Sequence, residues 1–169
     1  SNLGSIKTPR FPTILNTPGI EDIADNSVKV SWANSGETVT GIKILNATDS
    51  SVVKESSVSA TDVTNMYKIV TGLQSSAKYI IFLYSNTTVR GWANFTTKSA
   101  ITGNIIDLRE ISGVPSILED TLPDVSSGSI ILLKRGALYT IATSISLDRS
   151  VTIMSGTDLL VPDKARILM

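Results

Sequence analysis

The sequence predicts an all-β protein in which a β-sandwich is followed by the start of a parallel β-helix. Between residues 12 and 98, short runs of alternating apolar and polar residues are separated by Gly, Asn, Asp and Ser, which is the pattern of a sandwich. Beyond residue 105 the runs become shorter, and Ile130 and Val151, 21 residues apart, both begin one. That separation suits one coil of a stacked solenoid.

The composition excludes several kinds of chemistry. The chain has 169 residues, with no His and no Cys. Ser-His-Asp and Cys-His catalysis, disulfides and the usual zinc sites are therefore excluded. The net charge of zero disfavours a nucleic-acid partner, which needs a basic surface.

The composition also suggests a compartment. Charged residues make up 18% of the chain, and Ser plus Thr account for roughly a quarter of it. Such a hydroxyl-rich β-protein is typical of the extracellular space or the outer cell surface, so we expect a signal peptide to have been removed. No apolar run has the length of a transmembrane segment.

The sandwich is expected after an N-terminal tail, residues 1–11, and occupies residues 12–98. Val28, Val30 and Trp32 alternate with polar residues and share one face of a strand. The cluster from Asn34 to Glu37 forms a turn. We expect a seven-stranded sandwich that includes strands at 28–32, 41–45, 52–54, 66–70, 78–84 and 91–97.

One motif carries a family resemblance. Trp32 lies on an early strand, and Leu73 is followed six residues later by Tyr79. This arrangement resembles the fibronectin type III domain, in which that tyrosine forms a tyrosine corner. Ser75 and Ala77 stand where the family often has Pro and Thr. The resemblance covers about half of the chain and implies a spacer or interaction module.

Alternation assigns the strand residues to two faces. The residues expected to point inward are Val30, Trp32, Ile44, Tyr79, Ile81, Leu83 and Phe95, whereas Leu45, Ile80, Phe82, Tyr84 and Trp92 are expected on the outer face of the same sheet. An outer stripe this apolar indicates a contact. It is covered by the second half of the chain, contacts another protein, or stacks on sugar rings. Phe82, Tyr84 and Trp92 are the candidate binding residues.

The second half is expected to begin with a linker at residues 99–104. A strand follows at 104–108, and a short capping helix is expected near residues 115–121, with Pro115 at its start and Pro123 as its stop. Further short strands are expected at 130–133, 139–141, 145–147 and 151–154. Residues 105–169 would therefore form the cap and first coil of the β-helix.

The segments 127–139 and 150–156 resemble the opening of pectate-lyase-like β-helices, with Ser129 in place of the usual Asp. The resemblance implies a secreted or surface protein of a polysaccharide-degrading Gram-negative bacterium. About three coils are needed to stabilise a solenoid, so we expect the chain to be a fragment whose β-helix continues beyond Met169. Its exposed last edge would otherwise favour self-association.

No residue is nominated as catalytic, as a metal ligand or as a cofactor ligand. The acidic clusters Glu21–Asp25 and Glu119–Asp124 lack the spacing of a calcium loop and are expected to be solvated turns. The basic pair Lys134 and Arg135 is expected to be a solvated turn as well. Catalytic residues of pectate-lyase-like enzymes, which can use Ca²⁺, would lie beyond Met169.

Three functions remain open at this point. The first is a non-catalytic spacer or interaction module of a secreted protein that binds or degrades polysaccharide. The second is part of a pectate-lyase-like lyase or hydrolase. The third is a surface adhesion module with a protein ligand.

Overall fold

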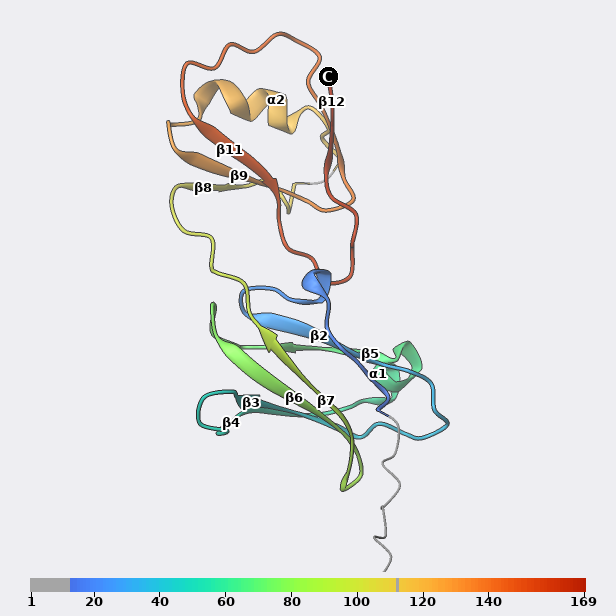
Figure 1. The fold of residues 1–169 in the computed structure, drawn as a ribbon. Coiled ribbons are helices and arrows are strands. Elements are labelled where there is room, and N and C mark those ends of the chain that lie inside the picture. The colour runs from blue at the N-terminus through green and yellow to red at the C-terminus, as the bar shows by residue number, and fades with distance from the viewer. Residues whose placement is uncertain (1–12, 112) are drawn as a thin grey trace, which may run out of the picture. The chain divides into compact units, whose positions relative to one another are not determined.

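The computed structural model describes residues 13–111 and 113–169. The chain divides into two compact units, Ser1–Ser99 and Ala100–Met169 (Figure 1). The expected N-terminal tail, residues 1–11, lies outside the described residues. Both units are built mainly of strands, which confirms the all-β class.

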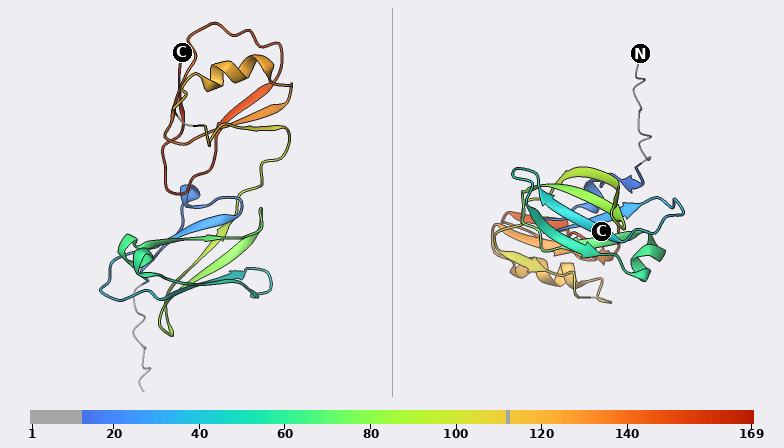
Figure 2. Two further views of the ribbon diagram at one scale, coloured as in Figure 1. Left: turned by 180° about the vertical axis from the view of Figure 1, so that it is seen from behind. Right: turned by 90° about the horizontal axis from the view of Figure 1, so that it is seen from below.

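The first unit is a sandwich of two antiparallel sheets, which are visible as separate layers (Figure 2). One sheet has the strand order β1-β2-β5 and the other the order β4-β3-β6-β7. The seven strands are β1 (Leu15–Asn16), β2 (Ser27–Trp32), β3 (Gly41–Asn46), β4 (Val52–Ser57), β5 (Tyr67–Thr71), β6 (Lys78–Ser85) and β7 (Thr88–Thr96).

The core of the sandwich contains the side chains that alternation places inside. All seven residues expected to point inward are buried in one cluster. The Tyr79 and Phe95 rings pack with their centroids 5.5 Å apart. The Gln74 N–H donates a 3.0 Å hydrogen bond to the Tyr79 hydroxyl, which confirms the expected tyrosine corner.

A short helix joins the two sheets, and alternation did not predict it. Helix α1 (Ala60–Asn65) begins at a capping box, in which the Asp62 N–H donates to Ser59 Oγ and the Ser59 N–H donates to Asp62 Oδ2. Met66 ends the helix in the left-handed region, with φ of 56°. A 3-10 turn, η1 (Ile20–Asp22), precedes β2 and was not predicted either.

The second unit is built from parallel strands. Its sheets have the orders β8-β9-β11 and β10-β12. Val151 pairs with Ser129 and Leu138 pairs with Arg166, so successive passes of the chain stack in parallel as expected for a coil. The strands are β8 (Ile105–Asp107), β9 (Ser129–Leu133), β10 (Leu138–Thr140), β11 (Val151–Ser155) and β12 (Arg166–Leu168).

A helical segment covers the core of the second unit. Helix α2 (Ile117–Thr121) lies within the expected range and continues directly into the 3-10 turn η2 (Leu122–Asp124), which contains Pro123. Leu118 and Leu122 are buried against Ile131 and Leu133 of β9. Ser129 is fully buried, and its hydroxyl donates to the Ser126 carbonyl while it accepts from Asn104 Nδ2.

Two expectations for this unit are wrong. Residues 145–147 are not a strand and join no sheet in the described part of the chain, because Ile145 packs on the core as an irregular segment. Arg135 is not simply solvated: its guanidinium donates to the Val161 and Pro162 carbonyls and ties the turn to the next pass of the chain.

Candidate functional site

The candidate site lies on the outer face of the sheet β4-β3-β6-β7. Trp92 of β7 is the register partner of Phe82 of β6, Phe82 is the partner of Lys43 of β3, and Lys43 is the partner of Glu55 of β4. These four residues form one row across the whole sheet. Since register partners point to the same face, the row brings two aromatic rings and two opposite charges together.

The structure places the predicted stripe where alternation expects it. Ile80, Phe82 and Tyr84 alternate with the buried residues of β6 and are themselves half-buried. Leu45, the partner of Ile80, is half-buried on the same face. Trp92 differs from its neighbours because 62% of its surface is exposed. The face therefore presents one free indole ring beside a half-covered phenyl ring.

A groove of about 530 Å³ lies beside Tyr84 on this face. Gly41 forms its floor, because Gly41 is the register partner of both Tyr84 and Ser57 and carries no side chain. The walls are formed by the Tyr84 ring, the Lys43 and Glu55 side chains, and residues 86 and 87 of the β6–β7 turn. Aromatic and polar groups thus surround an open stretch of backbone.

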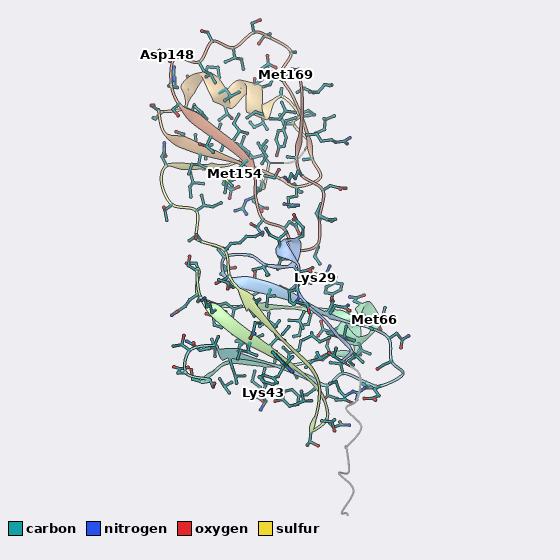
Figure 3. All side chains as sticks on the ribbon, viewed as in Figure 1. Lys29, Lys43, Met66, Asp148, Met154 and Met169 are labelled. Atoms are coloured by element: carbon teal, nitrogen blue, oxygen red, sulfur yellow. The ribbon has the colours of Figure 1, made fainter. Side chains whose placement is uncertain are left out.

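Lys43 and Glu55 form an ion pair at the edge of the groove. Lys43 Nζ lies 3.0 Å from Glu55 Oε1 and 5.6 Å from the centre of the Tyr84 ring. The hydrogen bond to Glu55, the Glu55 charge and the nearby Tyr84 together raise the pKa of Lys43. Lys43 lies on the sheet of the candidate site, whereas Lys29 lies on the other sheet of the sandwich (Figure 3).

The turn at the rim of the groove is held by hydrogen bonds from the facing loop. The Asn86 N–H donates to Thr40 Oγ1 over 2.7 Å, and Ser85 Oγ donates to the Thr38 carbonyl over 2.9 Å. Asn86 adopts a positive φ of 53°, which Asn tolerates better than most residues. The rim is therefore a defined wall of the groove.

Alternation identified the aromatic residues of this face but not the groove. Gly41, Lys43 and Glu55 come from strands whose mutual register shifts between Ile44 and Leu45. The one available signal was the glycine at the start of the expected strand 41–45, since a strand glycine often marks an open stretch of backbone.

The acidic clusters do not assemble into a metal site. Within residues 13–111 and 113–169, no group of three or more His, Cys, Asp or Glu side chains is placed to hold a metal ion. Glu119 is not merely solvated, because its carboxylate accepts from the backbone N–H groups of Ala142 and Thr143. These bonds and the Thr143 hydroxyl lower the pKa of Glu119.

In the part of the chain that the structure describes, no helix has the length and apolar character needed to cross a membrane.

No protein-family model matches the sequence, and no curated protein matches it. Among solved structures, the family 28 exopolygalacturonase of Yersinia enterocolitica is similar over 78% of this chain, with 13% identity and a TM-score of 0.40. This chain covers only 28% of that enzyme. The fn3 domain of human contactin 1 is similar over 62% of this chain and 98% of its own length, with 14% identity and a TM-score of 0.43. The fn3 domain of the human collagen alpha-1(XX) chain is 16% identical, over 61% of this chain and 96% of its own, with a TM-score of 0.37.

Proposed function

We propose that the chain is a non-catalytic module that binds polysaccharide outside the cell or on its outer surface, through the outer face of the sheet β4-β3-β6-β7. The observation that carries this proposal is the exposed indole of Trp92 beside Phe82. The hydroxyl-rich, weakly charged composition supports an extracellular location.

The chemistry of a pyranose ring suits this face. One side of such a ring presents C–H groups, which pack on an aromatic ring, while its edge presents hydroxyls that need hydrogen-bond partners. Trp92 and Phe82 offer the apolar surface, and the groove beside Tyr84 offers polar groups at its walls. A broad face of this kind suits a chain of sugars better than a small metabolite, which is usually enclosed.

Binding to soluble polysaccharides tests the proposal. We expect the protein to bind at least one of amylose, xylan, galactan and polygalacturonate in affinity electrophoresis. Trp92→Ala should weaken that binding about tenfold or more, since the indole provides the largest exposed apolar surface of the face. Tyr67→Ala is the matched control, because Tyr67 lies on the other sheet beside Lys29.

A protein ligand is the second candidate, and the aliphatic part of the face favours it. Val52, Leu45 and Ile80 are register neighbours across three strands, and such a patch suits a protein interface. Failure to bind any of the four polysaccharides, or equal binding by the wild type and Trp92→Ala, would contradict the polysaccharide proposal and leave this candidate.

A further inference from the structure

The groove beside Tyr84 carries both signs of charge at one point. Among the described residues that line the groove, Glu55 supplies a carboxylate and Lys43 supplies an ammonium group, and the two groups lie 3.0 Å apart. Each charge is therefore largely neutralised by the other at the place where a ligand would lie. The raised pKa of Lys43 shows that the carboxylate stabilises the ammonium form.

Such a pair recognises hydroxyls better than it recognises a carboxylate. A sugar hydroxyl can accept a hydrogen bond from the Lys43 ammonium, while a neighbouring hydroxyl donates to the Glu55 carboxylate. A ligand carboxylate would also be attracted by Lys43, but it would face the like charge of Glu55 at nearly the same distance. Its gain from one partner is offset by the repulsion from the other.

We propose that the groove of Gly41, Lys43, Glu55 and Tyr84 is a subsite for one unit of a neutral polysaccharide and discriminates against uronic acid units. This inference rests on the proposed polysaccharide binding and names its substrate class. The sugar ring would lie over Gly41 against the Tyr84 ring, with two hydroxyls at the ion pair.

The groove floor offers a direct way to block the subsite. A Cβ atom built on Gly41 would have the Ser56 carbonyl oxygen, at 3.8 Å, as its nearest contact, and Gly41 does not adopt a positive φ. A larger side chain at this position is therefore compatible with the strand and would project into the groove. Gly41→Val fills the subsite, and Val also has a higher strand propensity than Gly.

The main experiment compares polymers that differ only at C6. We would measure affinities for amylose and C6-oxidised amylose, and for polygalacturonate and its carboxyl-reduced form, at low ionic strength. The neutral member of a bound pair should bind about threefold or more tightly. Glu55→Gln should reduce this preference, since it removes the repulsion. Asp49→Asn, an equal charge change in an exposed turn, should keep it.

The outcomes separate this inference from the proposed function. Gly41→Val should weaken binding of the neutral polymers about tenfold, with an unchanged fold by circular dichroism. If Trp92→Ala abolishes binding but Gly41→Val does not weaken it, the face binds polysaccharide without this subsite and the inference is wrong. Equal or stronger binding of the acidic members by the wild type would also overturn the inference alone. Binding to neither member of either pair, nor to xylan or galactan, would overturn both.

Discussion

At the scale of single residues, two strand glycines have opposite roles. A Cβ atom on Gly91 of β7 would lie 2.5 Å from both Leu15 Cβ and Thr13 Oγ1, so the approach of β1 to β7 requires a glycine. A Cβ atom on Gly41 would meet only ordinary contacts. The two positions look alike in the sequence, and only the packing of β1 against β7 distinguishes them.

This contrast predicts the effects of two identical substitutions. Gly91→Ala should lower the free energy of unfolding by about 1–3 kcal/mol, because the added methyl group overlaps β1. Gly41→Ala should leave it unchanged or raise it by about 0.5–1 kcal/mol, because a glycine in a strand costs conformational entropy. Urea unfolding followed by tryptophan fluorescence measures both. Equal effects of the two variants would contradict the role assigned to Gly91.

Some residue environments follow from sequence, and others depend on register. The tyrosine corner of Tyr79 was predictable from its spacing to Leu73, and the structure confirms it. The ion pair between the buried Arg90 and the exposed Glu37, with Arg90 Nε 2.8 Å from Glu37 Oε2, was not predictable. Alternation puts Arg90 on the same face as Trp92, but a bulge in the β6–β7 ladder moves it out of register.

At the scale of elements, alternation predicts long strands and misses short segments. The six strands expected in the sandwich all exist. Five of them contribute buried side chains to the core, whereas β4 is an edge strand with no buried residue. Helix α1 has six residues, which is too short for a helical period to show. Its available signal was the capping-box pattern of Ser59 and Asp62. Strand β1, with two residues, is defined only by pairing with β2.

The candidate site also has one part that the sequence predicts and one part that it does not. Its aromatic stripe follows from alternation along β6 and β7, so the sequence was sufficient to predict it. The groove depends on which residues of β3, β4 and β6 are register partners. Because the register of β3 and β4 shifts between Ile44 and Leu45, these partners cannot be found by counting residues back from the turn that joins the two strands. Pairing between strands, rather than pattern within one strand, sets the polar half of the site.

The cap of α1 makes the stability of the sandwich depend on pH. The Lys68 ammonium, 2.8 Å from Asp62 Oδ2, and the Ser59 N–H lower the pKa of Asp62 to about 2. The folded-state pKa is below the unfolded value of 3.8, so this stabilisation is fully present above about pH 4 and is lost as the pH falls towards 2. The side chain of Asp62 is 21% exposed, and we expect the contribution to be on the order of 1–2 kcal/mol.

Asp62→Asn should therefore destabilise the sandwich near pH 6 and much less near pH 2, where about half of the folded wild-type carboxyl is already protonated. Lys68→Met should give a similar loss near pH 6 that also shrinks at low pH, because it removes the main cause of the lowered pKa. Urea unfolding of the three proteins at several pH values measures this. A constant difference from the wild type at all pH values would contradict the role of the Asp62 charge.

At the scale of the whole molecule, each unit has its own hydrophobic core. The cluster around Val30, Ile44 and Ile81 shares no residue with the cluster around Leu118, Ile131 and Leu133. Both tryptophans of the chain, Trp32 and Trp92, belong to the first unit. Fluorescence therefore reports on the first unit, and hydrogen exchange can follow the two units separately.

We expect a core substitution in one unit to destabilise that unit alone. Leu118 of α2 is fully buried, so Leu118→Ala should cost about 2–5 kcal/mol and reduce the hydrogen-exchange protection of β9. The amides of β6 and the fluorescence midpoint in urea should not change. Leu147→Ala, at a position that is 40% exposed in the same unit, is the matched control and should change neither readout. Equal loss of protection in β6 and β9 with Leu118→Ala would show instead that the two cores unfold as one cooperative structure.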